Sequence, residues 1–300
     1  MSLEELRGLI LRHARDDDTT VIDGVLLSVT AAAAPPSARP SGTCMALIAQ
    51  GAKRLVLGER AFDYRAGQYL VASVDLPVTG QFVEASRDRP AVGFGLTLRP
   101  AVIAELLLDH ADALAPRDDR GVPLGLVVSD ASAELVDAVI RMVRLLERPR
   151  DRAVLAPMIE REILWLLING EQGAAVRQLG LADSSLSHVS RVARWIRDHY
   201  AERLRVEDLA RMSRLSTSAF HRSFRAVTTM TPIQFQKQIR LHQARLLLAT
   251  RSDDVTRIGL AVGYDSGSQF SREYRRLFGV PPSEDADRMR TAQGREHRDQ

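Results

Sequence analysis

The residues with the most distinctive chemistry are arginines that hold equivalent places in a repeated pattern. Phe-x-Arg-x-aromatic-Arg spans Phe220–Arg225 and recurs at Phe270–Arg275. A guanidinium group presents a planar fork of N–H donors, which matches phosphate oxygens and the O6 and N7 acceptors of guanine. The sequence shows no Ser/His/Asp or Cys/His constellation of the kind that supports nucleophilic catalysis. The pattern therefore predicts recognition of a nucleic acid.

The spacing within each copy predicts a helix with two different faces. Aromatic residues four apart share one face of a helix, while the arginine between them points elsewhere. In the first copy, Phe220 and Phe224 are expected to be buried and Arg222 to project outward. The second copy predicts the same arrangement around Arg272. A major groove about 12 Å wide admits one such helix.

Each of these helices is preceded by a shorter helix and a tight turn. Val206–Ser213 supports the first and Val255–Val262 supports the second. Ser216 and Ser266 are expected N-caps, because a serine hydroxyl can accept a hydrogen bond from an otherwise unpaired amide of the first turn. The sequence therefore predicts two helix-turn-helix units.

A long helix is expected between the two units, over residues 231–250. Thr231 is a suitable N-cap, and Pro232 suits the first helical position because its missing N–H is not needed there. About 19 residues give a rod near 28 Å, which is comparable to the roughly 34 Å of one DNA turn. The two units could therefore enter successive major grooves on one face of the duplex.

Charge is distributed unevenly along the chain. The net charge of +3 divides into −4 over residues 1–180 and +7 over residues 181–300. A basic C-terminal part favours binding to a polyanion, because neutralised phosphates release condensed counterions.

The N-terminal part has a different pattern of apolar and polar residues. Short apolar runs between Val21 and Leu98 are separated by Gly, Pro, Asp and Arg, which predicts a β-sandwich or small barrel with turns at Gly58 and Gly67. Helical periodicity follows over residues 101–108, 131–146 and 155–169, the last helix beginning near Pro157. The apolar faces of these helices fit core packing and a dimer interface equally well.

Several classes of protein are disfavoured. No apolar stretch reaches membrane-spanning length and the N-terminus is acidic, so a cytoplasmic protein without membrane contact is expected. The single cysteine, Cys44, lies in an apolar run and is expected to be buried and inert. The segment from Val21 to Leu98 contains no histidine, so neither a metal nor another cofactor is expected and the chain is not expected to be an enzyme.

The sequence is similar to those of a known protein family. Residues 190–290 closely resemble the DNA-binding domain of the AraC-type transcription regulators, on a motif that ends in Val262-Gly263-Tyr264, Ser268–Arg272, Phe278-Gly279 and Pro281-Pro282. The N-terminal domain of one subgroup of that family is similar to the segments Gln50–Glu59, Tyr64–Leu70 and Asp75–Gly80. Together the matches cover most of residues 21–290.

The resemblance implies an α+β protein in which a cupin-like β-barrel with accessory helices precedes an all-α domain of seven helices. The expected boundaries are 1–170 for the effector-sensing or dimerisation domain, 171–189 for a linker rich in Gly, Ala and Gln, 190–290 for the tandem helix-turn-helix domain, and 291–300 for a disordered tail. Two departures from the family pattern are expected to matter locally. Thr229 replaces a glycine, so the first recognition helix should lack a left-handed cap, and Gly259 replaces an alanine, which should loosen its helix.

By position in the family motif, the residues expected to read bases are Ser218, His221, Arg222, Gly267, Ser268, Ser271 and Arg272. Arg225 and Arg275 are expected to contact phosphates, which positions the protein without specifying sequence. The implied partners are double-stranded DNA, a small-molecule effector, a second copy of the chain, and RNA polymerase if the protein activates transcription. The alternatives are a metal-independent cupin-type enzyme and an architectural protein that binds DNA without sequence preference.

Overall fold

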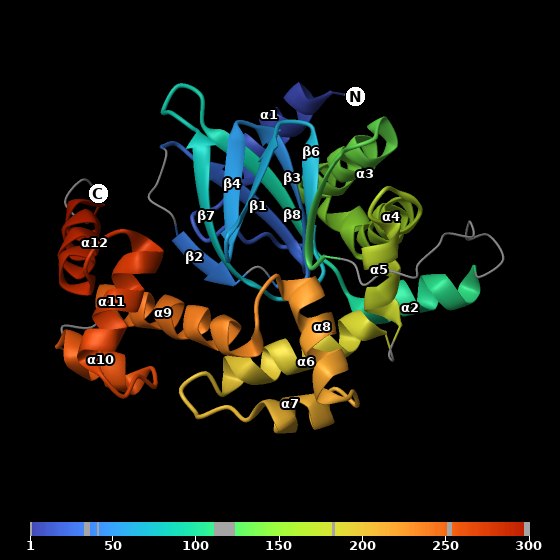
Figure 1. Cartoon of the computed structure of the whole chain (residues 1–300). Helices are drawn as coiled ribbons and strands as arrows, with labels where there is room; N and C mark the ends of the chain where they lie inside the picture. The colour runs from blue at the N-terminus through green and yellow to red at the C-terminus, as the bar shows by residue number, and fades with distance from the viewer. Residues whose placement is uncertain are drawn as a thin grey trace.

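Two antiparallel sheets with accessory helices form the N-terminal half of the chain, and the described elements of the C-terminal half are helices, so the fold is of the α+β class (Figure 1). The computed structural model describes residues 2–32, 37–40, 42–110, 124–181, 184–250 and 254–296. Figure 1 shows the strands at the top centre, α3 and α4 to their right, α6 to α9 beneath them, and α10 to α12 at the left.

The sheets have five and four strands. Every strand pairing among the described residues is antiparallel. The first sheet has the order β1 (Val25–Thr30), β8 (Ala91–Thr97), β3 (Cys44–Gln50), β6 (Gln68–Ala72), β9 (Leu126–Asp130). The second has the order β2 (Ser37–Pro40), β7 (Pro77–Glu84), β4 (Ala52–Leu57), β5 (Arg60–Arg65).

The turns at the two predicted glycines are confirmed. Gly58 has φ 62° between β4 and β5, and Gly67 has φ 84° between β5 and β6. Only a residue without Cβ adopts this region at little cost.

Cys44 is half-buried, and burial raises the pKa of its thiol to about 11.

Five α-helices accompany the described strands. They are α1 (Leu3–His13), α2 (Pro100–Asp109), α3 (Ala133–Arg144), α4 (Pro149–Asn169) and α5 (Gly173–Gly180), with the short 3-10 helix η2 (Leu145–Glu147) between α3 and α4. The predicted start of α4 near Pro157 is wrong, because the helix begins at Pro149 and carries Pro157 inside it. Proline suits the first helical position, where its missing N–H has no partner to lose.

The expected linker over residues 171–189 is largely helical. It contains α5 and the beginning of α6 (Ser185–Asp198). Val176 and Leu179 are buried, and the guanidinium of Arg177 donates to the carbonyl of Ile168 at 2.8 Å. A composition rich in alanine and glycine resembles a linker, but residues three apart in this segment supply the apolar face of a packed helix.

The C-terminal half has seven helices among the described residues. They are α6, α7 (Val206–Met212), α8 (Thr217–Thr228), α9 (Pro232–Thr250), α10 (Val255–Ala261), α11 (Gly267–Phe278) and α12 (Pro282–Glu296). The first begins at Ser185, before the expected boundary at 190. The last runs into the expected tail over 291–300, of which residues 297–300 lie outside the described part.

The apolar core divides between the two helix-turn-helix units rather than between the two halves of the chain. One cluster extends from the sheets through α3 to α6 and includes Phe220 and Phe224 of the first unit and Phe235 of α9. A separate, smaller cluster contains Phe270 and Tyr274 of the second unit. The first unit is therefore part of the main core, while the second has a core of its own.

Candidate nucleic-acid interface

The first recognition helix is α8, and its inner face is aromatic as predicted. Ser216 caps it, since its hydroxyl accepts the amide N–H of Ala219 at 3.3 Å. Phe220 and Phe224 are fully buried, with ring centroids 5.4 Å apart, and Phe224 meets Phe235 of α9 edge to face. This packing fixes the rotation of α8 about its own axis.

The outer face of α8 carries the predicted contact residues. Ser218, Arg222 and Arg225 are exposed. His221 is half-buried, with its ring centroid 6.1 Å from that of Phe220. The arginines therefore stand on the side opposite the aromatic anchors.

The second recognition helix, α11, repeats this design. The amide of Gln269 donates to the hydroxyl of Ser266 at 3.5 Å, and Phe270 and Tyr274 are fully buried. A Cβ built on Gly259 of α10 would lie 3.0 Å from the Phe270 ring. The glycine expected to loosen its helix thus also allows the close approach of this ring.

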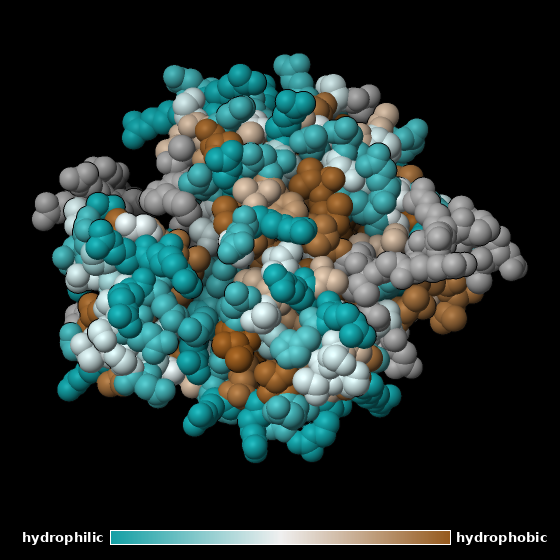
Figure 2. Space-filling model, in the orientation of Figure 1, coloured by the Kyte–Doolittle hydropathy of each residue, from teal (hydrophilic) through white to brown (hydrophobic). Residues whose placement is uncertain are grey.

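The outer residues of α11 are accessible too. Ser268, Arg272 and Arg275 are exposed, and Gly267 and Ser271 are partly exposed. The hydroxyls of Ser268 and Ser266 lie 2.8 Å apart, so the side chain of Ser268 is hydrogen-bonded to the residue that caps the helix. Figure 2 shows a mainly hydrophilic surface over α10, α11 and α12.

The carboxylate of Glu273 links α11 to the long helix α9 through hydrogen bonds. Glu273 accepts hydrogen bonds from Lys237 at 2.7 Å, from the Tyr264 hydroxyl at 2.9 Å and from Gln269 at 3.1 Å. Partial burial alone would raise the pKa of Glu273, but these donors outweigh burial and leave that pKa below its ordinary value.

A second carboxylate joins α9 to α11 and α12. Asp285 of α12 accepts the hydroxyl of Tyr274 at 2.7 Å and the Nε of Arg245 at 2.9 Å. Burial, together with the bond to Asp285, raises the pKa of Tyr274. Arg245 therefore stabilises the second unit internally.

The cap of α8 differs from expectation. Thr229 adopts the left-handed conformation, with φ 62° and ψ 2°, and its amide donates to the carbonyl of Arg225 at 2.9 Å. The prediction that this helix lacks a left-handed cap is therefore wrong. The conformation is costly for a β-branched residue, but Thr229 also donates from its hydroxyl to the carbonyl of Leu57, 3.4 Å away in the N-terminal half.

Three exposed arginines beside the recognition helices were not singled out from the sequence. Arg214 lies in the turn before α8, Arg257 lies on α10, and Arg276 follows Arg275 on α11. All three are exposed cations on the two units and are further candidates for phosphate contact. The only sequence signal for them is their position within or beside the motif.

A seam joins the two halves of the molecule, and we use this name for the contacts of Asp75, Thr79 and Gly125 with the C-terminal half. The guanidinium of Arg197 in α6 pairs with the carboxylate of Asp75 and donates to its carbonyl at 2.8 Å. The amide of Gly125 donates to the carbonyl of Val227, at the end of α8, at 2.8 Å. The recognition helix is thus attached directly to the N-terminal half.

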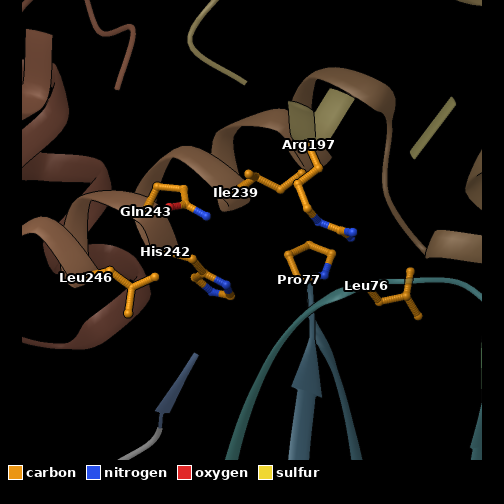
Figure 3. A pocket seen from close by; sticks show the side chains of 7 residues that line it. All are labelled: Leu76, Pro77, Arg197, Ile239, His242, Gln243 and Leu246. Carbon is orange, nitrogen blue, oxygen red and sulfur yellow. The ribbon is translucent and has the colours of Figure 1, made fainter. Parts of the chain in front are cut away.

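A small hollow, open to solvent, lies beside the seam. In Figure 3, Ile239, His242, Gln243 and Leu246 of α9 face Leu76 and Pro77, with Arg197 at the upper edge. Burial, with a smaller effect of Arg245, lowers the pKa of His242 to about 4.

Metal-ligating side chains do not cluster in the described part of the chain. No group of three or more His, Cys, Asp or Glu side chains among these residues could hold a metal ion. None of the described helices is both long and apolar enough to cross a membrane.

Comparison with known proteins assigns both halves. Residues 21–175 match the family of the AraC-type transcriptional regulator N-terminus, and residues 209–288 match a helix-turn-helix domain. The transcriptional activator RhaS of Escherichia fergusonii is 31% identical over 148 residues, which are 49% of this chain and 52% of that protein. The MmsAB operon regulatory protein of Pseudomonas aeruginosa is 36% identical over 100 residues, 33% of each chain. The chain thus spans about half, or less, of the length of these curated relatives.

Solved structures share the fold over nearly the whole chain. The crystal structure of ToxT from Vibrio cholerae O395 aligns with a TM-score of 0.52 at 12% identity, covering 89% of this chain and 98% of that one. Wild-type ToxT with a bound unsaturated fatty acid aligns with a TM-score of 0.54 at 12% identity, covering 89% and 96%. At this identity the likeness concerns the fold alone, and the assignment rests on the family match over more than half of the residues. The chain belongs to the AraC-type transcriptional regulators.

Proposed function

We propose that this chain regulates transcription by inserting α8 and α11 into successive major grooves of one DNA duplex. The observation that carries the proposal is that each helix buries two aromatic residues and exposes arginine on the opposite side. A helix anchored in this way presents a fixed set of side chains to base edges.

The residues divide by role. Arg222 and Arg272 have the geometry for bidentate bonding to guanine, and the smaller polar residues beside them supply single hydrogen bonds. Arg225 and Arg275 lie one turn further along each helix and contact phosphates. The proposed base-reading set remains Ser218, His221, Arg222, Gly267, Ser268, Ser271 and Arg272.

Sequence-specific reading is favoured over architectural binding. Architectural proteins insert apolar wedges into the minor groove and rely on phosphate contacts. Here the exposed faces of α8 and α11 are polar at the proposed reading positions. A catalytic role is not proposed, because the β-rich segment between Val21 and Leu98 holds no histidine for a metal site and the sequence shows no Ser/His/Asp or Cys/His constellation for metal-independent catalysis.

The N-terminal half is proposed to sense a small molecule and to transmit its state through the seam. Arg197 and Val227 bind that half directly, and Val227 lies in the last turn of α8. A shift of the N-terminal half would therefore move the recognition helix. Asp75→Asn should change operator affinity without added effector, since it weakens the ion pair while leaving the outer faces of α8 and α11 intact.

The chain is also proposed to act as a homodimer and, if it activates, to contact RNA polymerase. Val154 and Met158 are exposed on α4, 65% and 61% accessible, and supply an apolar surface within the helical region of the N-terminal half. Sedimentation at micromolar concentration should show a dimer. A monomer at all concentrations would contradict this part of the proposal.

Selection of DNA from a random library tests the main proposal. The full chain should enrich a bipartite sequence whose two segments lie about one helical turn apart. Competition with random DNA should then show binding to the enriched sequence at least about a thousandfold tighter. Equal affinity for both would favour the architectural alternative and overturn the proposal.

A further inference from the structure

The long helix α9 carries an arginine that touches both helix-turn-helix units. Arg240 lies in the middle of α9 and donates from Nε to the carbonyl of Tyr200 at 2.7 Å and from Nη2 to that of Glu202 at 2.9 Å. These carbonyls belong to the loop between α6 and α7, which we count with the first unit because it leads directly into α7. The same guanidinium donates from Nη1 to the carbonyl of Gly263 at 2.6 Å, in the turn between α10 and α11 of the second unit.

The two units meet directly at this point. A Cβ on Gly263 would lie 2.4 Å from the carbonyl oxygen of Ala201 and 2.8 Å from Nη2 of Arg240. Gly263 has φ 92°, so both its conformation and the close approach require glycine. The turn of the second unit is thus pressed against the loop of the first, with the guanidinium between them.

Three other polar residues of α9 make contacts with the units as well. Gln236, one turn earlier, donates to the carbonyls of Tyr200 and Glu202 in the first unit. Lys237 binds Glu273, and Arg245 binds Asp285, both in the second unit. Arg240 differs in these contacts, because its own hydrogen-bond partners come from both units.

Only a guanidinium has the donor geometry that this position uses. Its N–H groups lie in one plane and point in several fixed directions, so it can bridge carbonyls on separate segments. An ammonium group is a point charge on a flexible stem and cannot reproduce that fork. The acceptors follow the ends of α6 and α10, where helix carbonyls carry partial negative charge.

We infer that Arg240 is a positioning residue that sets the orientation of α11 relative to α8, and therefore the spacing between the two DNA segments that the protein accepts. The inference rests on the proposed function, because it assumes that both recognition helices contact one duplex. Arg240 acts through the two units and touches no DNA itself. Its effect should appear as tolerance of altered spacing rather than as loss of base preference.

The test compares full-length Arg240→Lys with the parent on the selected bipartite DNA and on the same DNA with one base pair inserted between its segments. One base pair rotates one segment by about 34° relative to the other. The parent should lose about tenfold or more in affinity on insertion, whereas Arg240→Lys should lose less than about threefold, because its units adjust independently. Arg245→Lys is the matched control, since it removes a guanidinium from the same helix but from an ion pair within the second unit, and it should keep the parent's dependence on spacing.

A second measurement needs neither DNA nor activity. Spin labels at Glu207→Cys in α7 and Leu260→Cys in α10, both exposed positions, report the distance between the units in a Cys44→Ser background. The distribution should be narrow with Arg240 and at least about twice as broad with Arg240→Lys. Parent-like spacing dependence in Arg240→Lys, or an unchanged distance distribution, would overturn the inference. Failure of the library selection would instead count against the proposed function, and the spin-label result would still decide the role of Arg240 within the domain.

Discussion

Thr79 of β7 and His242 of α9 meet across the seam, with 3.4 Å between the threonine Oγ1 and the histidine Nε2. The imidazole also lies against Phe278, and only 8% of His242 is accessible. Arg197 and Gln243 line the same hollow, and Arg245 adds a repelling positive charge. A protonated imidazole is therefore disfavoured at this place.

Stability is predicted to fall in mild acid because of His242. Its pKa is about 4 in the folded chain and about 6.5 when exposed. A histidine with a lowered folded pKa contributes stability above the unfolded pKa, and this contribution is lost as pH falls from about 6.5 towards about 4. The loss has an upper limit of about 3 kcal/mol. Urea unfolding at pH 7.5 and pH 5 should show a smaller pH effect in His242→Gln than in the parent, and an equal pH effect in both would contradict the prediction.

Loss of one base-reading arginine is predicted to weaken specific binding without unfolding the chain. Arg222→Ala and Arg272→Ala should each cost about 1 to 3 kcal/mol, because each removes one bidentate pair of hydrogen bonds to a base. Each variant should relax base preference in a different segment of the operator, because the two residues lie on different helices. Anisotropy titrations with single-base operator variants measure this, with exposed Arg60→Ala of β5 as the control. Unchanged operator affinity in both variants would contradict the assignment.

Arg225 and Arg275 are predicted to act through charge rather than sequence. Removing one phosphate contact should reduce the slope of log affinity against log salt by about 0.9. Arg225→Ala should therefore weaken binding to operator and random DNA by a similar factor, in contrast to Arg222→Ala on the same helix. A variant that loses base preference but keeps the salt slope would show that the two roles are exchanged.

The sequence was sufficient for the features that depend on local periodicity. Aromatic residues four apart, serine caps and the Thr231-Pro232 start predicted both recognition helices and α9, and all three are confirmed. The left-handed cap at Thr229 could not be predicted from the family preference for glycine, because that preference does not account for a hydroxyl that bonds to a carbonyl in the other half of the molecule. The pair of Asp75 and Arg197 could not be predicted, since the two residues lie 122 positions apart and only the packed fold brings them together.

The division of the core predicts different consequences for two equivalent aromatic residues. Phe220→Ala should cost about 3 to 5 kcal/mol, because it leaves a cavity in a fully buried site. Since Phe220 belongs to the main cluster, this loss should lower the unfolding midpoint reported by Trp165 in α4 and Trp195 in α6, two helices that contribute buried residues to that cluster. Phe270→Ala should cost a similar amount within the second unit, whose cluster is separate, and leave the tryptophan transition close to that of the parent. Denaturation followed by tryptophan fluorescence and by far-ultraviolet circular dichroism separates the two cases. Equal shifts of the fluorescence midpoint in both variants would mean that the two units unfold together. A Phe220→Ala variant as stable as the parent would mean that the Phe220 ring does not anchor α8.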